Sequence, residues 1–253
     1  MKSITGSLEG ALTRPAPRID CWPARGDRRS GLGLVIFPGG GYGGLADHEG
    51  APYAEYFSQA GLACFVVTYR LGTDGFRHPA MLEDALAAIA TVRSRAAEFN
   101  IDPARLGVIG SSAGGHLAAH AAVAYTCARC RPDFGILCYP AITMRDPYAH
   151  KGGRENLLGK RPSARLINAA SCERRVTART PPCFLWHTRD DDAVPVENSL
   201  LFAAALRRHG VPFELHVFDH GRHGLALSTT HPWAANCLLW LDRLFAPGGP
   251  GND

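Results

Sequence analysis

The chain has 253 residues, a hydrophobic content of 46% and a charged content of 20%, values typical of one large globular domain. Its net charge of +4 comes from scattered basic residues without a long basic run, so nucleic-acid binding is not favoured. No apolar stretch approaches about 18 residues, which argues against a transmembrane helix, and the N-terminus lacks the apolar segment of a secretory signal. We expect a cytoplasmic protein with no membrane partner.

Eight cysteines are spread along the chain, and several lie inside apolar runs, where they are expected to be small buried hydrophobes. This spread does not resemble the dense pattern of a disulfide scaffold. Cys127 and Cys130 form the one close C-x-x-C pair, but neither a second ligand pair nor a thioredoxin-like context accompanies it. We therefore expect reduced thiols, no metal ion and no other cofactor.

Residues 1–30 are rich in glycine, proline and arginine and predict an irregular N-terminal arm. Over residues 31–247, apolar runs alternate with amphipathic stretches. Strands are predicted at 32–37, 63–71, 105–110, 134–140, 182–188 and 212–218. Helices are predicted at 52–59, 79–99, 113–127, 163–171, 195–210 and 232–245. This alternation predicts an α/β fold, a single domain whose mostly parallel, doubly wound sheet has helices on both faces.

Residues 141–180 interrupt the alternation. They carry many arginine, lysine, glycine and proline residues and only the short predicted helix 163–171. The segment follows a strand of the parallel sheet, so we expect it to form a short cap or lid over the strand ends, where functional loops of such sheets gather.

A glycine-rich segment, PGGGYGG at 38–44, follows the first predicted strand. It matches G-x-G-x-x-G, the fingerprint of a dinucleotide site, but that fingerprint must open a helix at once. Here LADHEGA intervenes, and the helix is expected to begin near Pro52. The delay disfavours a dinucleotide-dependent oxidoreductase. The backbone amides of such a loop also suit an oxyanion hole, which holds the alkoxide of a tetrahedral intermediate.

The third predicted strand leads into a helix through G-x-S-x-G at 110–114. This is the context of a nucleophile elbow, a sharp turn that projects one serine above the sheet. Glycines two residues before and after the serine remove side chains that would collide at the turn. Ser112 is the central residue, and Ser111 is expected to point away. The alternative is a glycine-rich turn whose serine only caps a helix.

A serine nucleophile needs a base and an orienting carboxylate, and in this context they follow it in the order acid, then histidine. The fifth predicted strand ends in three consecutive carboxylates, Asp190, Asp191 and Asp192. The sixth ends in two histidines, His220 and His223. Candidates for both roles therefore lie at strand ends in the required order, and the residues alone leave the choice among them open.

Segments spread over about 33–227 resemble α/β-hydrolases of the acetyl-esterase and lipase-like group, near the carbohydrate esterases that include acetyl xylan esterases. In such proteins the acid loop reads H-x-x-x-D-x-x-V-P, which implies Asp191, and the base stands in G-x-H-G, which implies His223. The resemblance implies a serine carboxylic ester hydrolase that uses a Ser112, His223 and Asp191 triad through an acyl-enzyme. Its expected substrates are short-chain acyl esters, in particular O-acetyl groups of sugars or xylo-oligosaccharides.

Gly40, Gly41 and Ala113 are the expected oxyanion-hole donors, because such donors come from the residue after the nucleophile and from the loop after an early strand. Tyr42 and Trp186 are expected to line the substrate pocket.

Four further polar residues have expected roles. Glu49 and Arg70 either pair beneath the glycine-rich loop or remain solvated charges, Asp84 binds backbone or holds its helix, and His116 is structural. A peptidase or amidase of the same fold and a non-catalytic hydrolase-fold binding protein remain the alternative functions. A small-molecule ester is the expected partner, and homo-oligomerisation stays open.

Overall fold

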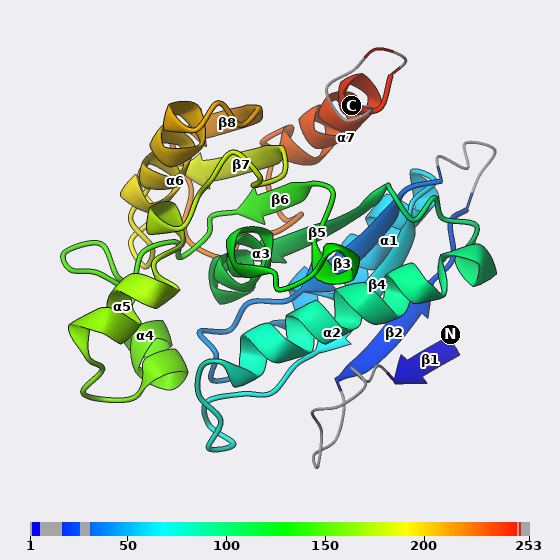
Figure 1. Cartoon of the computed structure of the whole chain (residues 1–253). Helices are drawn as coiled ribbons and strands as arrows, with labels where there is room; N and C mark the ends of the chain where they lie inside the picture. Colours follow the sequence, from blue (N-terminus) through cyan, green and yellow to red (C-terminus); the bar gives the residue numbers. More distant parts are fainter. Residues whose placement is uncertain (1, 6–16, 26–30, 247, 249–253) are drawn as a thin grey trace.

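The computed structural model describes residues 2–5, 17–25, 31–246 and 248. Its centre is one sheet of eight strands in the order β1-β2-β4-β3-β5-β6-β7-β8 (Figure 1). The strands are β1 Lys2–Thr5, β2 Arg18–Trp22, β3 Gly33–Phe37, β4 Ala63–Thr68, β5 Leu106–Ser111, β6 Gly135–Cys138, β7 Cys183–Thr188 and β8 Phe213–Phe218. The neighbours from β4 to β8 are all parallel. The six strands predicted from the sequence are confirmed.

Helices cover both faces of the sheet, as predicted: α2, α3 and α6 lie on one side and α1 and α7 on the other (Figure 1). The helices are α1 Ala51–Gln59, α2 Ala80–Ser94, α3 Ser112–Ala124, α4 Lys151–Leu158, α5 Ala164–Ala170, α6 Glu197–Arg208 and α7 Trp233–Leu244. Short 3₁₀ turns are η1 Asp47–Glu49, η2 Ala96–Phe99, η3 Ala128–Cys130 and η4 Cys172–Arg174. Among the described residues, no helix has both the length and the apolar character that crossing a membrane requires.

Two hydrophobic cores result, one on each face of the sheet. Because successive side chains of a strand point to opposite faces, each buried strand contributes to both cores. In β3, Val35 and Phe37 pack in the core beneath α2, α3 and α6, whereas Leu34 and Ile36 pack in the core beneath α1 and α7. A strand buried on both faces reads as a continuous apolar run, which explains why these strands are visible in the sequence.

The predicted irregular arm over 1–30 is wrong where the structure describes it. β2 pairs antiparallel with β4, and β1 pairs antiparallel with β2, so both strands extend the sheet. Ile19 and Cys21 of β2 are buried in the core, whereas Arg18 is exposed. This strand is only five residues long and stands among prolines and glycines, so its alternation was too short to be evident. Residues 1, 6–16 and 26–30 of the predicted arm lie outside the described residues.

The insertion at 141–180 forms α4, α5 and η4, of which the sequence predicts only α5. The α4 segment reads KGGRENLL, and its two glycines lower the helix propensity. The Asn156 side-chain amide donates to the Gly41 carbonyl at 2.9 Å, and the His78 amide donates to the Leu157 carbonyl at 2.8 Å. Helix α4 therefore lies against the loops that follow β3 and β4, at the carboxyl ends of the strands.

Candidate active site

Ser112 stands at the turn between β5 and α3, with a backbone φ of 53° in the left-handed region. A residue with a Cβ is strained in this region, and the surrounding structure must hold it there. A Cβ on Gly110 would overlap the carbonyl of Gly114, and a Cβ on Gly114 would overlap the carbonyl of Phe37. Both glycines are therefore sterically required. Ser111 points away from this turn, as expected, and its hydroxyl bonds to a buried tyrosine of α1.

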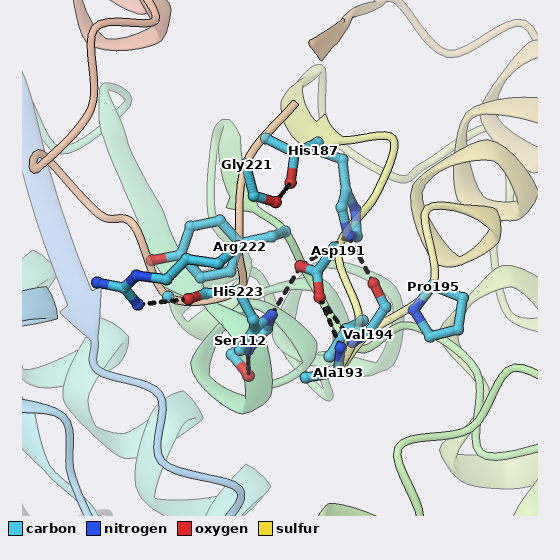
Figure 2. Close-up of polar contacts among 12 residues, drawn as sticks. Ser112, His187, Asp191, Ala193, Val194, Pro195, Gly221, Arg222 and His223 are labelled. Atoms are coloured by element: carbon cyan, nitrogen blue, oxygen red, sulfur yellow. Dashed lines mark hydrogen bonds and ion pairs between the residues drawn. The ribbon is translucent and has the colours of Figure 1, made fainter. Parts of the chain in front are cut away.

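A chain of hydrogen bonds connects this serine with the loops after β7 and β8 (Figure 2). His223 Nε2 lies 2.9 Å from Ser112 Oγ, and His223 Nδ1 lies 2.7 Å from Asp191 Oδ2. The other oxygen of Asp191 accepts the amides of Ala193 at 3.0 Å and Val194 at 2.9 Å. Backbone donors thus fix the orientation of the carboxylate, and the carboxylate orients the histidine.

The environment of Asp191 keeps this carboxylate ionised. Burial raises its pKa, but hydrogen bonds from His187, His223 and the Val194 amide outweigh burial, and the pKa lies below its ordinary range. The anion accepts the Nδ1–H of His223, so the Nε2 of the neutral ring carries a lone pair toward the Ser112 hydroxyl. This arrangement can take a proton from the serine.

The geometry decides between the candidates that the sequence left open. His220 Nδ1 lies 2.5 Å from Asp190 Oδ2, and Asp190 Oδ1 accepts the backbone amide of Gly221, the residue after His220, at 2.7 Å. The His220 side chain is 86% exposed, and Asp192 is exposed as well. Of the five candidates, all within the described part of the chain, only Asp191 and His223 join the hydrogen-bonded chain that reaches the serine.

The glycine-rich loop after β3 lies against the nucleophile, since a Cβ on Gly39 would be 3.1 Å from that of Ser112. The Gly39 amide is already used, because it donates to a buried carboxylate at 2.7 Å. The amides of Gly40, Gly41 and Ala113 donate to no acceptor within the described residues. Gly40 and Gly41 have φ values of 115° and 61°, which favour glycine. Three unused N–H groups are therefore present in the segments adjoining the serine.

The sequence model of a family described as having the alpha/beta hydrolase fold matches residues 34–227. The chain belongs to this family. Among solved structures, this chain is similar to the acetyl ester-xyloside bifunctional hydrolase from Caldicellulosiruptor lactoaceticus, with a TM-score of 0.83 and 41% sequence identity. The match covers 93% of this chain and 90% of that chain. The resemblance inferred from the motifs is confirmed.

Curated relatives of this chain include endo-1,4-beta-xylanase B of Butyrivibrio fibrisolvens, 38% identical over 207 residues, and the acetylxylan esterase of Xylanibacter ruminicola, 34% identical over 229 residues. These matches cover 77% and 86% of this chain, but 32% and 47% of the relatives. The chain therefore spans about a third to a half of their length. It belongs to the alpha/beta hydrolase fold family and is related to named esterases.

A buried carboxylate, expected from the sequence to pair with Arg70 or to be solvated, joins two loops of the site. Glu49 is 2% exposed, and its Oε2 accepts the Gly39 amide at 2.7 Å while its Oε1 accepts the Tyr139 hydroxyl at 2.7 Å. The Tyr139 oxygen in turn accepts the Ala226 amide at 3.0 Å, and its ring meets the His223 ring edge-on at 5.2 Å. Glu49 thus connects the glycine-rich loop with the loop that carries His223, and we call these contacts the Glu49 bridge.

Neither expectation for Glu49 and Arg70 holds, since they do not pair and neither is a solvated charge. Arg70 pairs instead with Asp84, whose Oδ2 accepts the Arg70 backbone amide at 2.8 Å and whose Oδ1 accepts its Nε at 2.9 Å. The expectation that Asp84 binds backbone is confirmed. Because Asp84 lies on α2, opposite the end of β4, its two contacts close the loop between these elements, and Glu49 is left for the glycine-rich loop.

Tyr42 and Trp186, expected to line the substrate pocket, are instead buried at 1% and 0% exposure. The Tyr42 hydroxyl bonds to His116 Nδ1 at 2.6 Å, and His116 Nε2 bonds to the Ala170 carbonyl at 2.7 Å. His116 is structural, as expected, and burial lowers its pKa to about 4, so the ring stays neutral. Trp186 stacks on Trp233 with ring centroids 5.0 Å apart. An aromatic residue close to the site along the sequence can therefore point into a core.

His150, a residue of the insertion, was not predicted to be near the site. Its Nδ1 accepts the Gly153 amide at 2.9 Å and caps the N-terminus of α4. The ring lies against the glycine-rich loop, since a Cβ on Gly41 would be 3.8 Å from its Cε1. Burial, and after it the charge of His223, lower the pKa of His150. No sequence motif marks this residue, because its position depends on the path of the insertion.

Proposed function

We propose that this α/β hydrolase is a serine carboxylic ester hydrolase that works through an acyl-enzyme. The observation that carries the proposal is the unbroken hydrogen-bonded chain from Ser112 Oγ through His223 to Asp191. Order along the chain, position at strand ends and tautomer all agree with nucleophilic catalysis by serine. No other serine needs to be invoked.

The proposed reaction begins with attack of Ser112 Oγ on the ester carbonyl, while His223 Nε2 takes the hydroxyl proton. Asp191 stabilises the imidazolium that forms. The carbonyl oxygen becomes an alkoxide, which accepts hydrogen bonds from the amides of Gly40, Gly41 and Ala113; one such donor contributes about 3 kcal/mol to lowering the barrier. The intermediate collapses, and the alcohol leaves with the proton from the histidine. Water then attacks the acyl-enzyme by the same route, which releases the acid and restores the serine.

The substrates in this proposal are short-chain acyl esters, in particular O-acetyl groups of sugars or xylo-oligosaccharides. The similarity of this chain to an acetylxylan esterase and to an acetyl ester-xyloside hydrolase supports this class. The insertion supplies the substrate contact in place of Tyr42 and Trp186. Since His150 Nδ1 accepts the Gly153 amide, the ring proton of the neutral form is on Nε2, a donor suited to an oxygen of the substrate.

The test is Ser112→Ala assayed with p-nitrophenyl acetate, with Ser111→Ala as the matched control and thermal unfolding as the measure of folding. Hydrolysis is expected to vanish in Ser112→Ala and to persist in Ser111→Ala, while both variants unfold cooperatively. Unchanged turnover in Ser112→Ala would refute the assignment. Cleavage of an acyl-peptide without ester hydrolysis would favour the peptidase alternative. Failure to react with a fluorophosphonate probe would favour a non-catalytic binding protein.

Acetylated xylo-oligosaccharides and p-nitrophenyl esters of increasing chain length define the substrate. Acetate release from the oligosaccharide, with kcat/KM falling as the acyl chain lengthens, is the expected pattern. A preference for long acyl chains would overturn the acetyl part of the proposal and leave the esterase part in place.

A further inference from the structure

A cysteine pair at η3 is not used by the proposed ester chemistry. The Sγ atoms of Cys127 and Cys130 lie 2.9 Å apart and share a hydrogen bond, and both cysteines are free. A disulfide bond has a length of about 2.05 Å, so the sulfur atoms need to approach by only about 0.9 Å. The two side chains are therefore already arranged to close a disulfide.

The hydrogen bonds around Cys130 stabilise its thiolate form. Its Sγ accepts the Cys127 amide at 3.2 Å and lies 3.6 Å from the Thr126 hydroxyl. Burial acts to raise the pKa of Cys130, but hydrogen bonds from Cys127 and Thr126 outweigh it, and the pKa falls below the ordinary value. The thiolate is the reactive form in thiol–disulfide exchange.

The other six cysteines have the opposite environment. They are all buried. Burial raises the pKa of Cys21 to about 11 and the pKa of Cys138 and Cys183 to about 12. Cys127, in contrast, is exposed, so an external reagent can reach the pair. Solvent access at Cys127 and a stabilised thiolate at Cys130 thus belong to the two members of one hydrogen-bonded pair.

The backbone around the pair is held in place by the preceding long helix. Arg93 of α2 donates from Nη1 to the carbonyls of Arg129 and Arg131, both at 2.7 Å, and its Nη2 bonds to Asp133 at 2.5 Å. The turn is therefore anchored independently of the two sulfur atoms. Helix α3, of 13 residues, separates the pair from Ser112 by about 20 Å. The two sites can thus act separately.

We propose that Cys127 and Cys130 are a redox-active dithiol that exchanges with low-molecular-weight disulfides such as oxidised glutathione. The exposed Cys127, whose S–H proton passes to the hydrogen-bonded Cys130 thiolate, attacks one sulfur of the external disulfide, and the other half leaves and takes up a proton as a thiol. Cys130 then attacks the Cys127 sulfur of this mixed disulfide and releases the second half. The two cysteine protons end on the two released thiols, so the protein pair is oxidised and one external disulfide is reduced. Within the described residues no group of three His, Cys, Asp or Glu side chains is placed to hold a metal ion.

The test uses the full chain equilibrated with graded ratios of reduced to oxidised glutathione, quenched with acid and alkylated before intact-mass and peptide analysis. The expected result is loss of two of the eight thiols, with the disulfide mapped to Cys127 and Cys130. Cys130→Ser is expected to accumulate the mixed disulfide on Cys127, and the Cys127→Ser, Cys130→Ser double variant to keep all its remaining thiols. Ester hydrolysis should be the same in all forms, which verifies folding.

Two results would overturn the proposal. One is a pair that stays fully reduced even in the most oxidising mixture. The other is thiol loss in the double variant equal to that in the unsubstituted chain, which would place the oxidation at the buried cysteines.

Discussion

The Glu49 bridge makes a quantitative prediction for Glu49→Gln, a substitution that keeps the side-chain volume and removes the charge. The carboxylate accepts two hydrogen bonds, from the Gly39 amide and the Tyr139 hydroxyl, both at 2.7 Å. A glutamine has one oxygen to accept one of these bonds, and its NH2 group must face the other donor. The neighbouring atoms leave little room for rearrangement, because a Cβ on Gly39 would already touch the Glu49 oxygen at 2.5 Å.

The cost follows from burial. A hydrogen bond to a charged group contributes about 1.5–3 kcal/mol, and a buried donor left without an acceptor costs about 1–3 kcal/mol. We therefore expect Glu49→Gln to lower the free energy of unfolding by about 2–3 kcal/mol. The substitution also affects the rate if the glycine-rich loop shifts. The largest expected decrease in kcat, about 10²–10³, is that of losing one proposed oxyanion-hole donor completely. For a partial shift of the loop we expect kcat to decrease by about tenfold to a hundredfold, with little change in KM.

The assay combines urea unfolding with steady-state hydrolysis of p-nitrophenyl acetate. Glu83→Gln is the matched control, because the Glu83 side chain is 53% exposed and its ion pair with Arg70 lies at the surface. The control should change stability by less than about 1 kcal/mol. If Glu49→Gln keeps both the stability and the kcat of the control, the Glu49 bridge does not position the loop and the reasoning is refuted.

Two further predictions concern the acid and the base. Because the folded pKa of Asp191 is depressed, its carboxylate contributes stability that is present above the ordinary aspartate pKa, about 4, and is lost as pH falls through the folded pKa. Urea unfolding from about pH 7 to about pH 3 should therefore show a smaller acid-induced loss in Asp191→Asn than in the unsubstituted chain, and equal losses would contradict the assigned interactions. His223→Ala should abolish ester hydrolysis, whereas His220→Ala, which removes an exposed ring paired with Asp190, should retain kcat within about twofold; the reverse result would transfer the role of base to His220.

The parallel strands and the nucleophile turn could be predicted because each has a strong local cause. Strands buried on both faces need continuous apolar runs, and the turn at Ser112 needs its two flanking glycines. β2 and α4 lack such causes: the former has only five residues, and the latter contains two glycines. Their formation depends on pairing with β4 and on packing against the glycine-rich loop, contacts that no local pattern encodes.

The site was predictable to the level of residue type and chain order. Three consecutive carboxylates look alike in sequence, and only the fold buries Asp191 while it leaves Asp190 to an exposed histidine. Tyr42 and Trp186 were misplaced for the same reason, since the facing of an aromatic side chain depends on what packs above it. Trp186 faces the core that contains Trp233. Burial of a side chain depends on how the helices pack on the sheet, and the propensity of a residue for helix or strand does not predict it.

The glycine-rich loop shows how such a site is held without regular structure. Its residues at positive φ make no regular strand or helix hydrogen bonds, so side chains from other segments must hold the loop in place. Gly39 donates to Glu49, the Gly41 carbonyl accepts Asn156 of α4, and the Tyr42 hydroxyl bonds to a histidine of α3. Three separate segments therefore determine where the unused amides point. A substitution at Asn156 in the insertion is then expected to change kcat through the loop, so the insertion contributes to the geometry of the proposed site.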